Sequence, residues 1–251
     1  MSRAGRAGFL ASAAAGLILL ATALSGRSPD RRALCPGSLV PAYLAPQAIL
    51  QLVERSTLPR LLVINPASGP GLAPDPAYRE AIAAAQAGGT KVLGYVPTTW
   101  GAKPAPDAEA EIDRYRDWYG VDGVFLDEAA ATAARLSYYH TLSHHARAVG
   151  ARFIVLNPGV MPAREYFGIA DAIVTFEGPI SAYRERRHAD DIAPERTVHL
   201  IYGASREQAL HALKPSPSAG YMYVTSGTLP HPWGTVPDYF AQELAALGDC
   251  Q

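Results

Sequence analysis

The chain has 251 residues, and 49% of them are hydrophobic, which is enough to bury a core in one large domain or two small ones. Its formal net charge at pH 7 is -1, so it lacks the basic excess that nucleic acids and anionic membrane surfaces attract. The composition argues against a nucleic-acid partner and favours a small or neutral ligand.

The first 35 residues are predicted to direct export and not to belong to the fold. Arg3 and Arg6 precede an apolar run over 9–24, and the small residues 21–23 lie near its end. This is the order found in an export signal. The run is long for a cleaved signal and short for a membrane span, so a cleaved signal and an uncleaved membrane anchor both remain open. We expect a secreted or extracytoplasmic protein with one folded domain at 36–251.

The two cysteines, Cys35 and Cys250, stand at opposite ends of that domain. In an oxidising compartment a disulfide between them would close nearly the whole domain. Two free thiols are the alternative, because a sequence does not show whether the two backbones approach each other.

Eight apolar runs of strand length follow in chain order. Most of them are apolar on both faces instead of alternating, as in a parallel sheet that is covered on both sides. The predicted strands are 39–44, 60–66, 91–98, 123–128, 152–159, 172–178, 198–204 and 220–227.

Alanine-rich or amphipathic stretches of helical length alternate with these strands. The predicted helices are 76–89, 107–120, 131–150, 205–213 and 237–247. Gly88, Gly120 and Gly150 stand where helix ends favour a residue free to adopt a positive φ. The alternation predicts a single (β/α)8 TIM barrel. A doubly wound open sheet is the alternative, but the first strand lacks the glycine-rich phosphate loop that such a sheet normally carries.

Polar and aromatic residues end these strands, and in a TIM barrel the strand ends form the mouth that holds the active site. Carboxylate, amide and aromatic side chains suit a carbohydrate, which offers hydroxyl groups for hydrogen bonds and C–H faces for stacking. The candidate substrate-binding residues are Tyr43, Asn65, Tyr95, Asn157, Tyr202 and, in the loop after the last strand, Trp233.

Three acids are the candidate catalytic residues. Cleavage of a glycosidic bond needs one carboxyl group that protonates the leaving oxygen and another that attacks carbon or activates water. Asp127 and Glu128 end the fourth strand, and Glu177 ends the sixth. Because like charges raise each other's pKa, the adjacent pair can help to hold a proton near neutral pH.

The roles of the acids are less well determined than their place. We assign Glu177 as general acid/base, Asp127 as the carboxylate facing the anomeric carbon, and Glu128 as a neighbour that tunes Asp127 or positions the sugar. The sequence does not separate Asp127 from Glu128, because adjacent residues of a strand point to opposite faces. Asp127 can alternatively cap the following helix, and turn chemistry alone can explain Asn65 and Asn157, which both precede proline.

A rival chemistry is a metal site at His140 and His144. Their spacing of four residues places them on one helix face, and the segment His-Thr-x-x-His is similar to a metal motif of polysaccharide deacetylases. The pair lies in mid-helix, however, and the Asp-Asp segment that should precede the motif is missing. We therefore expect neither a metal nor an organic cofactor.

Five segments in order give the chain a resemblance to one family. "VINPASGPG" (63–71), "VLGYVPTTWG" (92–101), "GVFLDE" (123–128), "VLNPG" (155–159) and "FEG" (176–178) together resemble the spherulation-specific spherulin-4 family of glycoside hydrolases, over roughly residues 39–228. The resemblance implies a (β/α)8 hydrolase that cuts inside α-1,4-linked polymers of N-acetylgalactosamine or galactosamine in microbial matrices such as biofilms. Its acidic positions carry over onto Asp127, Glu128 and Glu177. The chain departs from the family at Trp100, where tyrosine is expected, and at Val160, where threonine is common.

These observations predict an exported, monomeric endo-glycosidase whose partner is an amino-sugar polysaccharide. Two alternatives remain: a catalytically inactive barrel that binds matrix or cell-envelope polysaccharide, and a metal-dependent polysaccharide deacetylase. The inactive barrel would keep the aromatic and amide residues, while the deacetylase would lose its activity to a chelator.

Overall fold

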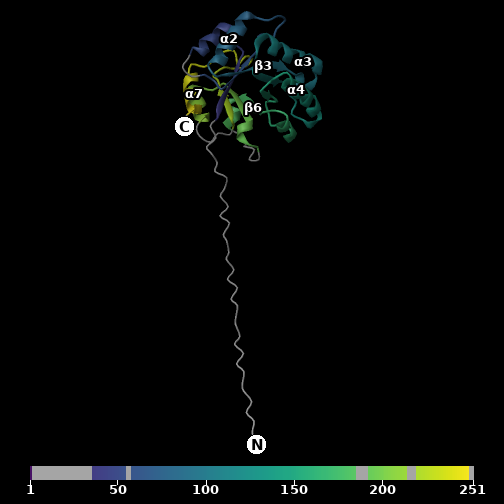
Figure 1. The fold of residues 1–251 in the computed structure, drawn as a ribbon. Helices are drawn as coiled ribbons and strands as arrows, with labels where there is room; N and C mark the ends of the chain where they lie inside the picture. The colour runs from purple at the N-terminus through teal and green to yellow at the C-terminus, as the bar shows by residue number, and fades with distance from the viewer. Residues whose placement is uncertain (2–35, 55–57, 185–191, 214–218, 249–251) are drawn as a thin grey trace. The chain divides into compact units, whose positions relative to one another are not determined.

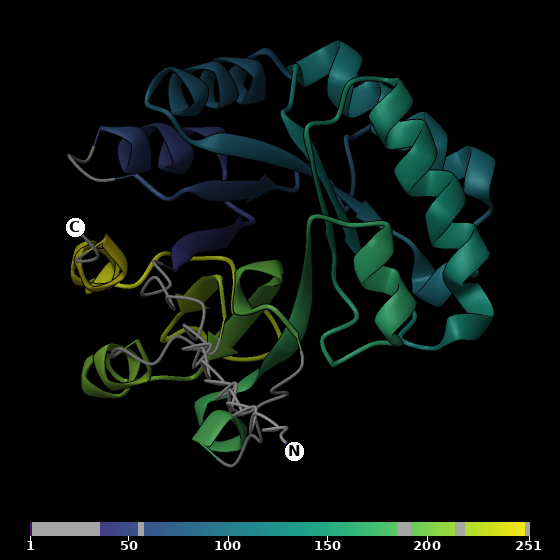
Figure 2. The same ribbon diagram turned by 60° about the horizontal axis from the view of Figure 1, so that its bottom comes forward.

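Eight parallel strands form a closed barrel in the computed structural model, which describes residues 1, 36–54, 58–184, 192–213 and 219–248 (Figures 1 and 2). The ring closes where Gly37 and Ser38 pair with Tyr221 and Met222. The (β/α)8 prediction is therefore confirmed, and the open sheet is excluded. The strands are β1 (Gly37–Ala42), β2 (Leu61–Ile64), β3 (Lys91–Pro97), β4 (Gly123–Asp127), β5 (Phe153–Leu156), β6 (Ala172–Pro179), β7 (Thr197–Tyr202) and β8 (Tyr221–Val224).

The strands are buried on both faces, as their continuous apolar sequences predict. Every residue of β1 and of β2 is buried. One strand face packs inside the barrel and the other packs under the helices, so the core has two layers.

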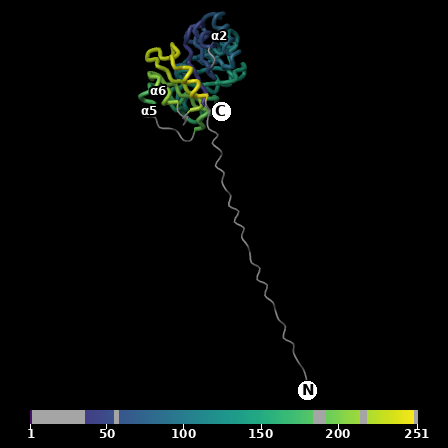
Figure 3. Tube along the Cα trace, turned by 90° about the vertical axis from the view of Figure 1, so that its left-hand side faces the viewer, coloured from purple at the N-terminus to yellow at the C-terminus, as the bar shows by residue number. Residues whose placement is uncertain are grey.

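The helices of the described residues lie around the outside of the strands (Figure 2). They are α1 (Pro46–Val53), α2 (Pro76–Ala87), α3 (Ala105–Arg114), α4 (Leu136–Ala148), α5 (Ile180–Arg184), α6 (Arg206–Ala212) and α7 (Phe240–Gly248). The sequence analysis missed α1 and α5, which are only 8 and 5 residues long. The five residues of α5 carry too few turns to show a helical period, and α1 follows Ala45, which gives no side-chain cap to mark its start. In Figure 3, α5 and α6 lie close together on one flank of the barrel.

The helix ends follow local chemistry. Asp75 begins α2 by accepting a hydrogen bond from the Ala77 backbone, and Ser205 forms a reciprocal capping box with Gln208 at α6. Gly120 and Gly150 have φ values of 62° and 101°, as expected for helix-ending glycines. At α2 the positive φ falls on Gly89, at 91°, and not on Gly88.

Five short helical turns complete the described elements: η1 (Thr99–Gly101), η2 (Tyr115–Tyr119), η3 (Ala133–Arg135), η4 (Arg164–Gly168) and η5 (Pro194–Arg196). The predicted helix 107–120 is α3 continued by the π-helical turn η2, and the predicted helix 131–150 is η3 followed by α4.

Within the described ranges, none of the helices has the length and apolarity required to span a bilayer. The predicted export segment lies outside the described residues, as do Cys35 and Cys250.

Candidate active site

The acids come from neighbouring strands at one end of the barrel. Asp127 is the last residue of β4, Asn157 directly follows β5, and Glu177 lies near the end of β6. These three strands pair in that order. Because all the strands are parallel, their carboxyl ends open at the same mouth.

Asn157 joins two of the acids through a single atom. Its Nδ2 donates to Asp127 Oδ1 at 2.7 Å and to Glu177 Oε2 at 2.6 Å. The amide therefore uses both of its hydrogens on the two carboxyl groups. Such an arrangement fixes the separation and the relative orientation of the two acids.

The local backbone settles which way the Asn157 amide faces. Its Oδ1 accepts from the Gly159 backbone N–H at 3.0 Å, so the nitrogen must be the atom that faces the acids. Gly159 has a φ of 69°, and its carbonyl accepts from the Glu177 backbone N–H at 2.9 Å. The turn after β5 thus ties Asn157 to β6. The predicted turn chemistry is therefore present at the amide oxygen of Asn157, while its amide nitrogen bonds to the two acids.

Asp127 is a half-buried acid with three donors. Burial raises the pKa of Asp127, while the Tyr95 hydroxyl, the Glu128 backbone N–H and the Asn157 amide oppose that shift by donating to its carboxylate. The carboxylate is engaged in the mouth, and the next helical turn begins only at Ala133. Asp127 therefore does not cap the following helix.

Glu177 is a half-buried acid with fewer donors. Burial raises the pKa of Glu177, and the Asp127 charge raises it further. The Asn157 amide and the Trp233 indole N–H donate to the carboxyl group and oppose the shift. The sequence analysis placed Trp233 near a sugar but did not foresee this hydrogen bond.

Glu128 turns away from the pair that Asn157 joins. Its backbone has a φ of 50°, and its Oε2 accepts from the Thr99 backbone N–H at 3.2 Å. The carboxylate therefore faces the η1 turn after β3. The structure separates the two adjacent acids, which the sequence could not: Asp127 faces Glu177, and Glu128 faces the rim.

Thr98 and Tyr139 hold this turn in place and were not among the predicted site residues. Thr98 Oγ1 lies 2.8 Å from the Asp127 carbonyl, 3.0 Å from the Glu128 carbonyl and 2.9 Å from the Tyr139 hydroxyl. The single Thr98 hydrogen serves the carbonyls, so Tyr139 donates to Thr98 and accepts from the Ala130 N–H at 2.8 Å. Tyr139 comes from α4, and no sequence signal links it to the strand ends.

The predicted aromatic residues line the same mouth. Tyr43 packs edge-on against Tyr95, with ring centroids 5.3 Å apart. Burial raises the pKa of Tyr43, and the Asp127 and Glu177 charges add to the shift. Tyr202 packs edge-on against Trp233 at 6.2 Å. Aromatic pairs thus flank the acids.

Asn65 holds its own loop. Its Oδ1 accepts from the Gly69 N–H at 2.9 Å, which closes the turn after β2. Turn chemistry is therefore present at Asn65, at the mouth of the barrel.

His140 and His144 are exposed on α4, outside the barrel. Neither is part of a metal-holding group, because no set of three or more His, Cys, Asp or Glu residues within the described part of the chain is arranged for one. The adjacent His145 pairs with Asp113 at 2.8 Å.

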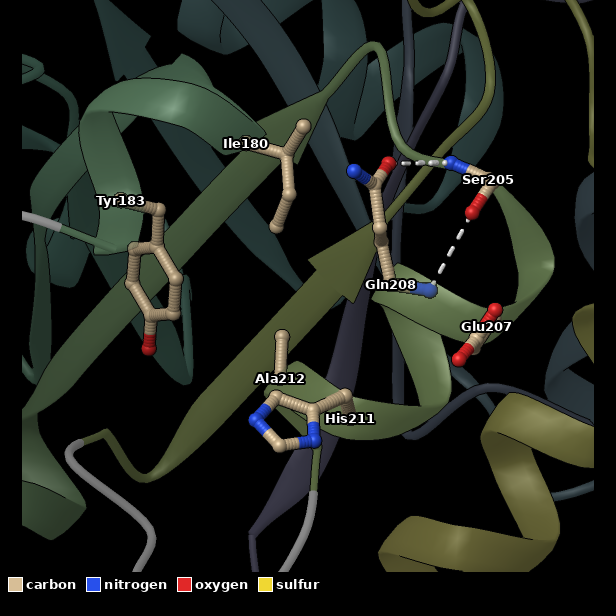
Figure 4. A pocket seen from close by; sticks show the side chains of 7 residues that line it. All are labelled: Ile180, Tyr183, Ser205, Glu207, Gln208, His211 and Ala212. Carbon is tan, nitrogen blue, oxygen red and sulfur yellow. Dashed lines mark hydrogen bonds between the residues drawn. The ribbon is translucent and has the colours of Figure 1, made fainter.

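A separate cavity of about 710 Å³ lies between α5 and α6 on the flank of the barrel (Figure 4). Its lining includes Ser205 and Gln208, whose polar groups bond to each other in the capping box. None of the three acids lines it. The chemistry therefore belongs to the mouth of the barrel and not to this cavity.

Comparison with known proteins accords with this geometry. Residues 38–247 match the family described as Spherulation-specific family 4. The chain belongs to this family. A curated member, Spherulin-4 of Physarum polycephalum, is 31% identical over 230 residues, which cover 83% of this chain and 69% of that protein.

Solved structures share the fold of this family 4 chain. The crystal structure of Aspergillus clavatus Sph3 in complex with GalNAc is similar with a TM-score of 0.75 and 24% identity, over 85% of this chain and 98% of that one. The α-amylase of Geobacillus thermoleovorans in complex with acarbose is similar with a TM-score of 0.51 and 10% identity, over 87% and 78% of the two chains. At these identities the two structures support only the barrel fold.

Proposed function

We propose that the protein is a glycoside hydrolase that cleaves internal α-1,4 bonds of a polysaccharide containing N-acetylgalactosamine or galactosamine. The single observation that carries the proposal is the Asn157 amide nitrogen, which holds the carboxyl groups of Asp127 and Glu177 together at the barrel mouth. Two carboxyl groups in reach of one bond are the machinery that glycoside cleavage needs.

The spacing of the two acids favours a retaining mechanism. Asp127 Oδ1 and Glu177 Oε2 lie 2.7 and 2.6 Å from the same nitrogen, so these oxygens are at most about 5.3 Å apart. Retaining enzymes hold their carboxyl groups about 5–5.5 Å apart, whereas inverting enzymes need about 6.5–9.5 Å to admit a water. An acid at this distance attacks carbon directly.

The hydrogen bonds support the assignment of roles. Asp127 has three donors, which favour its anion, and it serves as the nucleophile that bonds to the anomeric carbon. Burial and the nearby Asp127 charge favour the protonated form of Glu177, and only two donors oppose them. It gives its proton to the leaving glycosidic oxygen. Water then attacks the glycosyl ester, Glu177 takes up the water proton, and Asp127 leaves as a carboxylate.

The remaining mouth residues bind the sugar in this scheme. The aromatic rings of Tyr43, Tyr202 and Trp233 offer faces and edges to C–H groups, and Glu128 on the rim accepts hydrogen bonds from sugar hydroxyl or amino groups. Asn157 acts as a positioning residue, because both of its amide hydrogens are engaged by the acids.

The substrate class rests on the family and on the chemistry of the mouth. The related Sph3 structure holds GalNAc, and the acids at the mouth of this chain suit neutral or cationic amino sugars better than anionic ones. We place the enzyme outside the cytoplasm as a monomer, with residues 36–251 as the catalytic domain and 1–35 as the export signal or membrane anchor.

The test is release of new reducing ends from α-1,4-linked galactosaminogalactan by the purified protein, beside Glu177→Gln and Asp127→Asn, with and without EDTA. We expect release that survives the chelator and is lost in both variants, with retained anomeric configuration by NMR. Release of acetate that EDTA abolishes, without new reducing ends, would support the deacetylase instead. Binding of the polymer without release by the unsubstituted protein would support the inactive barrel.

A further inference from the structure

Large exposed hydrophobic side chains gather at the mouth of the barrel. Apart from Met1, those of the described residues all lie in loops that follow the carboxyl end of a strand: Leu72, Trp100, Val160, Met161 and Leu229. Because the strands are parallel, these loops surround the same opening as the acids. The rim of the candidate active site is therefore apolar in several places.

Trp100 is the aromatic member of this set, with 61% of its surface exposed. Its backbone N–H donates to the Glu128 carbonyl at 2.7 Å, and the preceding Thr99 N–H donates to Glu128 Oε2. The Trp100 backbone is thus hydrogen-bonded to Glu128, the residue that follows Asp127. The indole ring is therefore carried by the rim segment that bonds to Glu128, and most of it is exposed to solvent.

The backbone that presents Trp100 is strained. Thr99 and Trp100 have φ values of 49° and 50°, in the left-handed region that residues with side chains seldom adopt. The turn is fixed on both sides, since the Thr98 carbonyl accepts from the Gly101 and Lys103 N–H groups. Consecutive strained residues persist where the surroundings impose them, and they cluster at ligand-binding sites. Here the strain keeps a large apolar ring in water.

We propose that Trp100 is a stacking platform for one pyranose ring of the polysaccharide, at a subsite next to the scissile bond. A galacto-configured ring has an axial 4-hydroxyl, which leaves its C3–H, C4–H and C5–H groups on one apolar face. An exposed indole is complementary to such a face, because its electron-rich ring attracts polarised C–H groups. This inference rests on the proposed function and adds the residue that selects the face of the sugar.

The kinetic test compares Trp100→Ala, Trp100→Phe and Leu72→Ala on galactosaminogalactan. Leu72 is the matched control, because it is exposed and apolar on the same rim but lacks a ring. We expect KM of the alanine variant to rise about tenfold, corresponding to the loss of one stacked ring, with a smaller change in kcat. The phenylalanine variant should keep most of the affinity, and Leu72→Ala should match the unsubstituted protein.

A second measurement reports on the ring itself. In Glu177→Gln, polymer binding should protect tryptophan fluorescence from iodide quenching, because the other two tryptophans are less exposed than Trp100. The protection should disappear when Trp100→Phe is added. Thermal unfolding of each variant shows whether the fold is intact. If Trp100→Ala does not fold, the quenching comparison with Trp100→Phe still tests the platform.

The outcomes separate this inference from the proposed function. Hydrolysis with KM unchanged in Trp100→Ala, or quenching unchanged by polymer, would overturn the platform and leave the glycosidase standing. If the unsubstituted protein neither hydrolyses nor binds the polymer, both the Trp100 platform and the proposed glycosidase function are overturned. A higher KM in Trp100→Ala together with ring protection establishes the subsite.

Discussion

Asn157 donates from one amide nitrogen to Glu177 at 2.6 Å, and the same nitrogen donates to Asp127 at 2.7 Å. The proposed general acid and the proposed nucleophile are thus positioned by a residue that has no acid or base role of its own. The geometry of the pair depends on this amide as much as on the strands.

The first prediction concerns this amide. Asn157→Ala removes a donor from each acid, so both buried carboxyl groups become harder to ionise and lose their fixed separation. We expect kcat to fall by about 10²-fold or more. Asn157→Asp should be worse, because it adds a third negative charge. Asn65→Ala changes the other Asn-Pro turn without touching the acids and should cost much less kcat; an equal loss in both variants would contradict the bridging role.

The second prediction concerns the alkaline side of the pH profile. The Trp233 indole N–H lowers the pKa of Glu177, so Trp233→Phe should raise that pKa. Glu177 must be protonated to act as the acid, and the fall in kcat/KM at high pH should therefore move to higher pH. Trp118→Phe is the matched control, because Trp118 lies on η2 and not among the contacts of Glu177. A shift in the control, or none in Trp233→Phe, would refute the assignment.

The third prediction concerns the acidic side. The Tyr95 hydroxyl donates to Asp127 and lowers its pKa. Tyr95→Phe should raise the pKa of Asp127, so the acidic limb of the pH profile should move to higher pH. Tyr78→Phe removes a hydroxyl that bonds the Leu44 carbonyl at 2.9 Å, and it should affect stability without moving this limb. If the two variants had the same acidic limb, Asp127 would not be the ionised nucleophile.

The fourth prediction concerns stability. Glu243 on α7 is fully buried, and its Oε1 accepts from the Val224 N–H at 2.8 Å. Burial raises the pKa of Glu243 well above its usual value. The folded state then binds more protons than the unfolded state, so this group makes the protein less stable as the pH rises above the unfolded pKa, until the folded pKa is reached.

Glu243→Gln keeps the acceptor but cannot ionise. We expect it to raise Tm at neutral pH, by roughly 2–4 °C for each 1 kcal/mol gained, and to leave Tm nearly unchanged near pH 4. Melting curves between pH 4 and 8 give the comparison. Glu207→Gln, at an exposed position in the first turn of α6, should show no such pH-dependent gain. A parallel gain in both would show that burial of Glu243 is not the cause.

The sequence was most informative where burial dictates residue type. Strands apolar on both faces revealed the barrel, and polar residues at their ends revealed Asp127 and Glu177, because a parallel barrel brings all strand ends to one mouth. Helix α5 escaped prediction because five residues cannot show a period.

The finer geometry depends on contacts between distant segments. Sequence could not show that Glu128 adopts a φ of 50° and faces Thr99, because that turn is imposed by the hydroxyl of Thr98 and, through it, by Tyr139 of α4. The Trp233 hydrogen bond to Glu177 joins a loop after β8 to β6, which no local pattern encodes.

The two acids and Asn157 come from β4, β5 and β6, a continuous stretch within residues 123–179. The residues proposed to bind the sugar include Tyr43, Trp100 and Tyr202, which lie at or just after the ends of β1, β3 and β7, outside that stretch. The residues proposed to cleave the bond therefore lie in a different part of the chain from several of those proposed to hold the polymer. Substitutions at the ends of β1, β3 and β7 are thus expected to change polymer binding while residues 123–179, which carry the acid pair, stay the same.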